Sequence, residues 1–213
     1  MERIPDYFPE LSAKQLTQLE QLSTLWRAWN AKVNLISRKD IHNLEERHLL
    51  PSLAITKVVQ FPPGTRVLDV GTGGGLPGLP LAIYFPQVQF SLIDSIGKKI
   101  RVVQSIAQVL NIKNVSASQI RVESLDEKFD FITGRAVTAL SRFIKWTHDH
   151  LTMGEHNGLL YLSGGDLTSE LKQLEGHPMQ CYPLSEMYTE EFFNEKCLIY
   201  VKAKHLIKIK SPI

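Results

Sequence analysis

Cysteine is scarce in this sequence, and no long apolar run occurs in it. Only two cysteines are present, Cys181 and Cys197, without a C-x-x-C pair or a spaced histidine pattern. Their scarcity excludes the common zinc-binding motifs and favours two reduced thiols in a cytoplasmic protein without a metal. No stretch approaches the roughly 18 apolar residues of a membrane-spanning helix, and the first residues lack the apolar core of a signal peptide. We therefore expect a cytoplasmic chain with no membrane segment.

The sequence also has little net charge. Its 24 Lys and Arg against 22 Asp and Glu give a formal charge of +2, which is too small by itself to identify a nucleic-acid-binding protein. The C-terminal end is nevertheless basic and contains no acidic residue after position 195. Such an end could contact phosphate groups, although it is more often a solvated tail. Its lysines are Lys196, Lys202, Lys204, Lys208 and Lys210.

The first 60 residues have the pattern of a helical extension. Apolar residues recur in steps of three and four between positions 11 and 29, and Ser12 with Gln15 matches a capping box, so a helix is expected there. A second helix is expected from Asp40 to about Leu50, with Pro51 interrupting or restarting it. At 213 residues the chain suits one substantial core plus an extension. We expect a helical extension over residues 1–60 and a Rossmann-like domain over residues 61–213.

From residue 65 onward, short apolar strands alternate with helical stretches. This order predicts an α/β fold, in which a mostly parallel sheet carries helices on both faces and binds ligands at the carboxyl ends of its strands. The last two strands should be antiparallel, because the segment between them is too short and irregular for a crossover helix. The expected strands are 66–70, 89–93, 115–119, 129–133, 159–162, 179–183 and 197–201, and the expected helices are 79–84, 98–110, 139–150 and 167–174.

A glycine-rich turn follows the first of these strands in the stretch "VLDVGTGGGLPGLP". Gly71, Gly73 and Gly75 stand where the strand passes into a helix, and glycine there lets a ligand approach the backbone closely. Asp94 ends the next strand, where a carboxylate can accept hydrogen bonds from the two hydroxyls of a ribose. Together, these residues indicate a cofactor that contains adenosine.

The same turn can be aligned with two cofactor motifs. Counted from Gly73 to Gly78 it has the spacing of a dinucleotide site, but its first glycine then lies two residues late relative to the strand. Counted from Gly71, the third position of that motif is Leu76, which is too large. Asp69 adds an acid beside the turn, which suits the cationic sulfonium and ammonium groups of S-adenosylmethionine better than a pyrophosphate. The residues favour S-adenosylmethionine, with a purely structural turn as the alternative.

These motifs resemble the class I S-adenosylmethionine-dependent methyltransferases. More narrowly, they resemble the glucose-inhibited division protein B family (RsmG-like), the bacterial 16S ribosomal RNA guanine-N7 methyltransferases. The resemblance covers most of residues 26–165, and it implies a seven-stranded sheet whose last strand is antiparallel. The glycine turn with its Leu-Pro-Gly is the most specific match. The matching segments are "WNAKVNLIS" (29–37), "RHLLPSL" (47–53), "LDVGTGGGLPGLPLAI" (68–83), "LIDSIGKK" (92–99), "RVES" (121–124) and "GRAV" (134–137).

The resemblance also implies roles for individual residues. It puts the ribose at the end of the second strand, the adenine after the third, and the meeting point of donor and substrate at Arg135 after the fourth. Two positions depart from the family, which usually has an aspartate in place of Pro51 and a lysine in place of Ser163. The implied cofactor-binding residues are Gly71, Gly73, Gly75, Leu76, Asp94, Ser95, Val122, Glu123 and Arg135, and Arg135 is also the implied catalytic residue.

The segment after the fourth strand, "FITGRAV", faces the methyl acceptor in such a fold. It lacks the Asn/Asp-Pro-Pro-aromatic clamp of amine methylation, and no cysteine is nearby to activate a cytosine ring. Guanine N7 needs neither, because its lone pair is available at neutral pH. We expect an in-line displacement in which Arg135 orients the guanine through O6 or a phosphate. Candidate RNA contacts are Arg38, Lys39, Arg47, His48, Arg142 and Lys145.

The expected partner is 16S ribosomal RNA or the small ribosomal subunit, and the expected state is a monomer. A methyltransferase of the same fold with another substrate is one alternative. The other is a non-catalytic RNA-binding assembly factor, against which the intact glycines and Asp94 argue.

Overall fold

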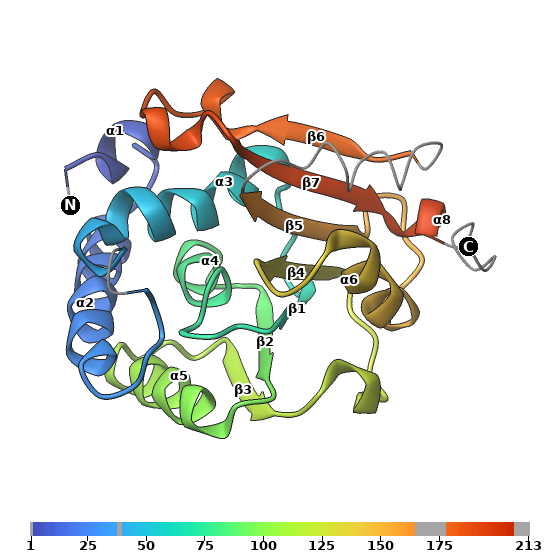
Figure 1. The fold of residues 1–213 in the computed structure, drawn as a ribbon, viewed down its shortest axis with the longest axis horizontal. Coiled ribbons are helices and arrows are strands. Elements are labelled where there is room, and N and C mark those ends of the chain that lie inside the picture. Colours follow the sequence, from blue (N-terminus) through green and yellow to red (C-terminus); the bar gives the residue numbers. More distant parts are fainter. Residues whose placement is uncertain (1, 38–39, 165–177, 207–213) are drawn as a thin grey trace.

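Seven strands form one sheet in the order β3-β2-β1-β4-β5-β7-β6 in the computed structural model (Figure 1). The structure describes residues 2–37, 40–164 and 178–206. Strands β1 to β5 pair in parallel, and β7 runs antiparallel to both β5 and β6, as the sequence predicts. The strands are β1 (Arg66–Val70), β2 (Gln89–Asp94), β3 (Val115–Gln119), β4 (Phe131–Arg135), β5 (Gly158–Gly164), β6 (Gln180–Pro183) and β7 (Lys196–Lys202).

The fourth strand lies two residues later than its apolar pattern suggests. Phe129, the expected start, forms only an isolated bridge with Leu151, and the ladder with β1 begins at Phe131 opposite Val67. The register with the neighbouring strands decides these bounds, and a single strand's apolar run does not reveal that register. As a result, Arg135 is the last residue of β4 rather than a residue of the loop after it.

Helices cover both faces of the sheet, and side chains alternate between two apolar clusters along each central strand. On β1, Val67 belongs to the cluster under α2 to α5, whereas Leu68 belongs to the cluster under α6 and α8. The expected helix 167–174 lies outside the described residues. The helices are α1 (Ile4–Tyr7), α2 (Ala13–Asn30), α3 (Leu50–Val58), α4 (Gly78–Tyr84), α5 (Gly97–Val109), α6 (Leu140–Thr147) and α8 (Ala203–Leu206).

Helix α2 begins as its capping-box pattern predicts. Ser12 Oγ accepts a hydrogen bond from the Gln15 backbone N–H at 3.3 Å, and Gln15 Oε1 accepts one from the Ser12 backbone N–H at 3.0 Å. The buried face of α2 packs beside α4 and α5 (Figure 1). Its Trp26 is fully buried and donates from Nε1 to the Gly74 carbonyl oxygen at 2.7 Å. This hydrogen bond connects the N-terminal extension to the glycine turn. The division of the chain into an extension and a domain at residue 60 stays a prediction.

The helix expected from Asp40 to Leu50 is irregular, and Pro51 restarts it. A 3-10 turn covers Ile41–Asn43, and a π-helical segment covers Glu45–Leu49. Helix α3 then begins at Leu50 with Pro51 in its first turn, where proline is tolerated because the first backbone N–H groups have no intrahelical acceptor. The irregular segment turns His48 inward, where it is buried.

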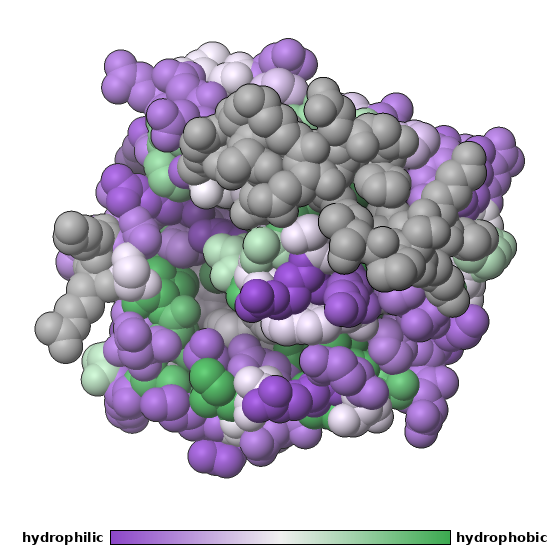
Figure 2. Space-filling model, turned by 45° about the vertical axis from the view of Figure 1, so that its right-hand side comes forward, coloured by the Kyte–Doolittle hydropathy of each residue, from purple (hydrophilic) through white to green (hydrophobic). Residues whose placement is uncertain are grey.

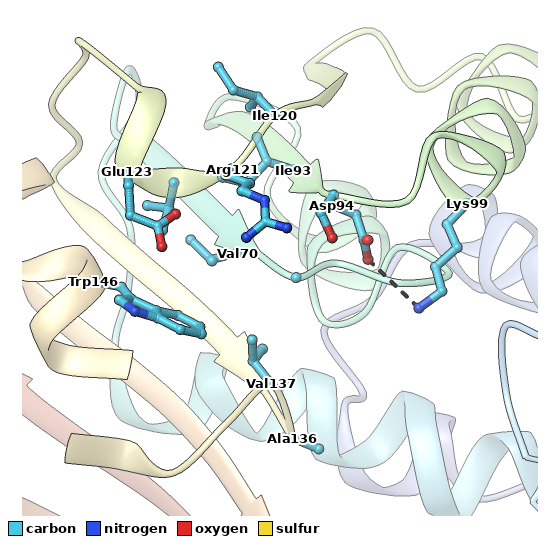
Figure 3. A pocket seen from close by; sticks show the side chains of 13 residues that line it. Val70, Ile93, Asp94, Lys99, Ile120, Arg121, Glu123, Ala136, Val137 and Trp146 are labelled. Atoms are coloured by element: carbon cyan, nitrogen blue, oxygen red, sulfur yellow. Dashed lines mark ion pairs between the residues drawn. The ribbon is translucent and has the colours of Figure 1, made fainter. Parts of the chain in front are cut away.

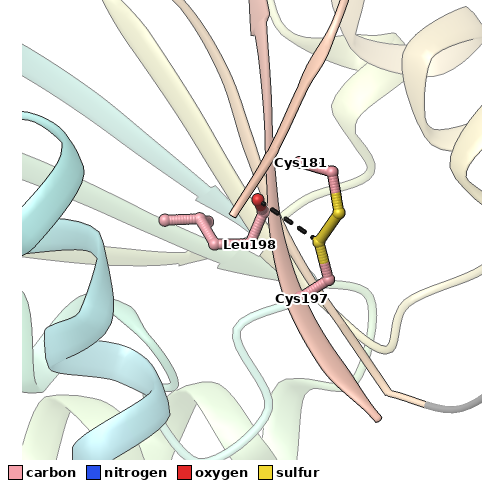
Figure 4. Close-up of a disulfide and its surroundings, with 3 residues drawn as sticks. All are labelled: Cys181, Cys197 and Leu198. Carbon is pink, nitrogen blue, oxygen red and sulfur yellow. Dashed lines mark hydrogen bonds between the residues drawn. A yellow bond between two sulfur atoms is a disulfide. The ribbon is translucent and has the colours of Figure 1, made fainter. Parts of the chain in front are cut away.

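The two cysteines form a disulfide between β6 and β7, so the expectation of two reduced thiols was wrong. Figure 4 shows the bond between Cys181 and Cys197, which are 16 residues apart in the sequence. The antiparallel pairing of their strands places Cys181 opposite Ile199 and Pro183 opposite Cys197. The two cysteines therefore lie diagonally across neighbouring strands, and only the register of that pairing brings them together.

The surface seen in Figure 2 is mostly hydrophilic, with smaller hydrophobic areas between the polar side chains. Within the described ranges, no helix combines the length and the apolar character needed to cross a bilayer. Among the described residues, the exposed large hydrophobic side chains are Ile96 and Val109, at opposite ends of α5, and Met153 in the loop before β5.

Candidate functional site

The glycine turn leaves β1 in a backbone conformation that favours glycine. Gly71, Gly73 and Gly75 have φ values of +69°, +59° and +94°. A Cβ built on Gly71 would lie 2.9 Å from Val137 Cγ2, which is closer than side chains normally approach. Glycine at position 71 therefore provides both the left-handed turn and the close approach of the loop that follows β4.

Asp69 supports this turn from inside the protein. Its carboxylate is fully buried, and it accepts hydrogen bonds from Thr72 Oγ1 at 2.6 Å and the Gly78 backbone N–H at 3.0 Å. Burial raises its pKa to about 6, although the hydrogen bonds oppose that shift. Asp69 therefore supports the shape of the turn. It does not line the cavity next to the turn, although the sequence suggested that its charge would face the cofactor.

A cavity of about 270 Å³ opens at the carboxyl ends of β1, β2 and β4 (Figure 3). We call it the first cavity. It lies where ligands bind in open α/β sheets, as expected. Apolar and charged side chains both border it, and they come from the ends of the strands and from α5 and α6. Its lining residues are Val70, Gly71, Ile93, Asp94, Ser95, Lys99, Ile120, Arg121, Val122, Glu123, Ala136, Val137 and Trp146.

Asp94 provides the carboxylate of the first cavity. Its Oδ2 accepts from the Gly73 backbone N–H at 3.0 Å, and its Oδ1 accepts from the Ile96 backbone N–H at 2.9 Å. Lys99 Nζ is 3.9 Å from Oδ2. Each carboxylate oxygen can accept a further hydrogen bond, so the pair can also receive the two hydroxyls of a ribose. The backbone contacts hold the carboxylate in one orientation.

The other end of the first cavity is suited to a flat apolar group. Val122 and Glu123 lie on a short 3-10 helix, Val122–Ser124, directly after β3. The indole of Trp146 reaches the same cavity from α6, away from the Asp94–Lys99 pair (Figure 3). Trp146 was not among the expected site residues, because a single aromatic residue in a predicted helix cannot be told from a core residue by its sequence pattern. An adenine ring fits such a slot through apolar contact and stacking.

Several residues expected at the cofactor are not among the described residues that border the first cavity. Gly73 acts through its N–H to Asp94, and a Cβ on Gly75 would lie 2.4 Å from Leu79 Cδ1, so Gly75 gives room to α4. Leu76 is buried. Arg135 borders a different cavity, which adjoins the first one at Ala136.

This second cavity has a volume of about 250 Å³ and lies between β4, β5, β7 and the segment before α3. Both positions that depart from the family pattern, Pro51 and Ser163, border it. Lys196 of β7 pairs in register with Gly164, so its side chain also reaches this cavity. The lining residues are Asp40, Arg47, His48, Pro51, Arg135, Ala136, Leu162, Ser163, Gly164, Leu184, Phe192 and Lys196.

Positive charge dominates the second cavity. Arg135 Nη2 donates to His48 Nδ1 at 2.7 Å, and burial lowers the pKa of Arg135 to about 10, so it stays charged at neutral pH. Burial, followed by the charge of Arg135, lowers the pKa of His48 to about 3. Arg47 forms an ion pair with Asp40 and stacks over the Phe192 ring. The cavity is therefore lined by a neutral histidine and two guanidinium groups.

Of the other candidate RNA contacts, Arg142 and Lys145 are described and line neither the first nor the second cavity. Arg142 and Lys145 are exposed on α6. Arg38 and Lys39, like Lys208 and Lys210 of the basic end, lie outside the described residues. Among the expected RNA contacts that are described, only Arg47 and His48 border a cavity.

The chain is similar to known proteins along most of its length. The family model described as rRNA small subunit methyltransferase G matches residues 15–194. A protein named ribosomal RNA small subunit methyltransferase G from Flavobacterium psychrophilum is 50% identical over 208 residues, which cover 96% of this chain and 99% of the relative. A protein of the same name from Phocaeicola vulgatus is 47% identical, over 94% of this chain and 98% of the relative. Among solved structures, an S-adenosylmethionine-dependent O-methyltransferase from Thermotoga maritima matches with a TM-score of 0.56 at 17% identity. The match covers 76% of this chain and 69% of that one, and it shows that the two proteins share a fold.

Proposed function

The chain belongs to the rRNA small subunit methyltransferase G family, and from this premise we propose how its two cavities transfer a methyl group from S-adenosylmethionine to N7 of a guanine in 16S ribosomal RNA. The observation that carries the proposal is the adjacency of the two cavities. Ala136 borders both of them, at the end of the strand that also carries Arg135.

The first cavity has the features that the methyl donor requires. Asp94 offers carboxylate oxygens for the ribose, the slot beside Val122 and Trp146 suits the adenine, and Gly71 leaves room beside the backbone. S-adenosylmethionine supplies an activated methyl group on a sulfonium when it is bound there. Lys99 lies near Asp94, so the net charge of that end is close to neutral.

The second cavity adjoins the donor at the point where an acceptor base must enter. Ala136 has φ +50°, a left-handed conformation that is uncommon for a residue other than glycine and that is frequent at functional sites. This bend separates the two cavities and directs Arg135 away from the donor, toward His48.

The residues of the chain act in this reaction by binding and alignment. N7 of guanine attacks the sulfonium methyl group, the carbon–sulfur bond breaks, and no proton has to be removed first. The gain in rate then comes from holding the two reacting atoms close and in line. Arg135 keeps its charge and orients the base from the side of O6, because a donor aimed at N7 would block the attack.

We propose that one copy of the chain is sufficient and that it acts in the cytoplasm, where small ribosomal subunits are assembled. Size-exclusion chromatography with light scattering tests the monomer, and a dimer that loses activity on dilution would contradict it.

The decisive test offers tritiated S-adenosylmethionine to small ribosomal subunits, naked 16S RNA and total protein extract. We expect label in the subunits or the RNA, recovered as 7-methylguanosine by mass spectrometry of the nucleosides. Label in protein or in small metabolites would overturn the proposed substrate. The variant Arg135→Ala should bind the methyl donor normally and lose transfer; full transfer would remove Arg135 from the mechanism.

A further inference from the structure

Three side-chain N–H donors of the second cavity have no hydrogen-bond partner among the described residues. They are Arg47 Nε, His48 Nε2 and Arg135 Nη1, all of them buried. Their three residues all border the second cavity. Buried polar groups in folded proteins are nearly always paired. Unpaired donors around a cavity therefore point to acceptor atoms on the ligand that enters it.

The contact between Arg135 and His48 determines which nitrogen of His48 can donate. A guanidinium has only donors, so the Arg135 Nη2 contact at 2.7 Å requires His48 Nδ1 to be the acceptor. The proton of the neutral ring must then be on Nε2. The lowered pKa of His48 agrees with a neutral ring at physiological pH. The residues that border the cavity on this side therefore carry buried N–H donors without a partner, and one of these donors is on a neutral side chain.

Guanine and adenine differ at the atom that such donors would meet. Next to N7, guanine has the acceptor O6, whereas adenine has an amino group, which is a donor. N7 itself must stay free to attack the methyl group. O6 is thus the one acceptor on that edge of guanine that buried N–H groups can use without preventing the reaction.

We propose that His48 determines base specificity, by donating from Nε2 to O6 of the guanine that is methylated, beside Arg135. The inference rests on the proposed function, since it concerns the acceptor of the same reaction. An adenine at this position would direct its amino group at the same donors and leave all of them unpaired. A site built to pair with a base carbonyl rejects a base that lacks it.

A phosphate group also accepts hydrogen bonds, so it is the competing ligand for these donors. Asp40 argues for the base, because its carboxylate borders the same cavity. The surplus of positive charge in the cavity would also suit a phosphate, but only guanine presents N–H donors, on its Watson–Crick edge, that the Asp40 carboxylate can accept. Asp40 is held by Arg47 and by the Ser37 hydroxyl, and it remains on the cavity wall.

The test uses small-subunit RNA that carries one of three bases at the guanine mapped by the labelling experiment. Guanine and inosine both have O6, and 2-aminopurine keeps N7 but lacks O6. Single-turnover rates at saturating S-adenosylmethionine are compared for the natural protein, His48→Leu and His48→Gln. His42→Leu is the matched control, because His42 lies in the same segment but is exposed.

With the natural protein, we expect inosine to react almost as fast as guanine and 2-aminopurine to react roughly ten- to a hundredfold more slowly. His48→Leu should slow guanine by a similar factor but leave 2-aminopurine unchanged, since the lost partner of His48 is O6. His48→Gln restores an amide donor and should recover part of the preference. His42→Leu should behave as the natural protein does.

Three results would overturn the inference. One is a natural protein that methylates guanine and 2-aminopurine equally fast. Another is a His48→Leu variant that slows both bases by the same factor, as a purely structural residue would. The third is competition by inorganic phosphate that depends on His48 and is accompanied by no base preference. If His48→Leu does not fold in thermal melting, the natural protein and His48→Gln decide the question with the same three bases. Failure of the proposed function looks different, because no small-subunit RNA is then methylated at all.

Discussion

Replacing Gly71 by alanine should impose two separate costs on the glycine turn. The first comes from the backbone, because φ is +69° there and a left-handed conformation costs an L-residue about 1–2 kcal/mol. The second comes from packing, because the new Cβ would lie 2.9 Å from Val137 Cγ2 and such overpacking costs roughly 1–3 kcal/mol. Gly71→Ala should therefore reduce the free energy of unfolding by about 2–5 kcal/mol.

Gly64 offers a matched control for the backbone cost alone. Its φ is +83°, and a Cβ built there meets nothing within 4 Å. Gly64→Ala should reduce the free energy of unfolding by only about 1–2 kcal/mol. Chemical denaturation of both variants measures the difference, which is the cost of the contact with Val137.

The same clash should weaken binding of the methyl donor. Val137 borders the first cavity, so a Val137 side chain displaced by the new methyl group narrows it or shifts its wall. We expect the dissociation constant of S-adenosylmethionine, measured by calorimetry, to rise at least about tenfold, or about 1.4 kcal/mol. Gly71→Ala combined with Val137→Ala should recover part of this affinity, because the clashing methyl groups are gone. Equal stability and equal donor affinity of Gly71→Ala and Gly64→Ala would show that the contact with Val137 costs nothing and would refute this prediction.

Three further predictions concern residues around the glycine turn. Trp26→Phe leaves the buried Gly74 carbonyl without its donor and should cost about 1–3 kcal/mol of stability, measured by chemical denaturation. The control Trp29→Phe, on the same helix, should cost less. Equal costs would contradict the role of the hydrogen bond. Asp94→Asn should weaken binding of S-adenosylmethionine at least about tenfold in calorimetry, because hydrogen bonds to charged groups are worth about 1.5–3 kcal/mol, and unchanged affinity would remove Asp94 from the ribose site. Burial raises the pKa of Asp69 to about 6, so the contribution of Asp69 to stability is full in acid and is lost as the pH rises through that value. An NMR titration of its carboxyl carbon should show a midpoint near 6. A midpoint near 4 would refute the effect of burial.

The order of elements could be predicted well from the sequence, because apolar periodicity and turn residues act locally. The strands at 66–70 and 115–119 have the predicted bounds, and α2 begins at the predicted capping box. The fourth strand was misplaced by two residues, since its register depends on β1 and β5. Likewise, the disulfide between Cys181 and Cys197 depends on how β6 pairs with β7.

The candidate site also combines features that local sequence predicts with features that only the packing of the fold creates. Local sequence determined the glycine turn, the carboxylate of Asp94 at the end of β2 and the family to which the chain belongs, because a strand, a turn and a helix follow one another along the chain. Only the tertiary structure decided that Asp69 supports the turn from inside, that Trp146 reaches the first cavity, and that Arg135 meets His48 in a second one. Arg135 and His48 are 87 positions apart, and the packing of the helices on the sheet buries Asp69 and brings Trp146 to the first cavity, so no local pattern of residue types could have revealed this arrangement.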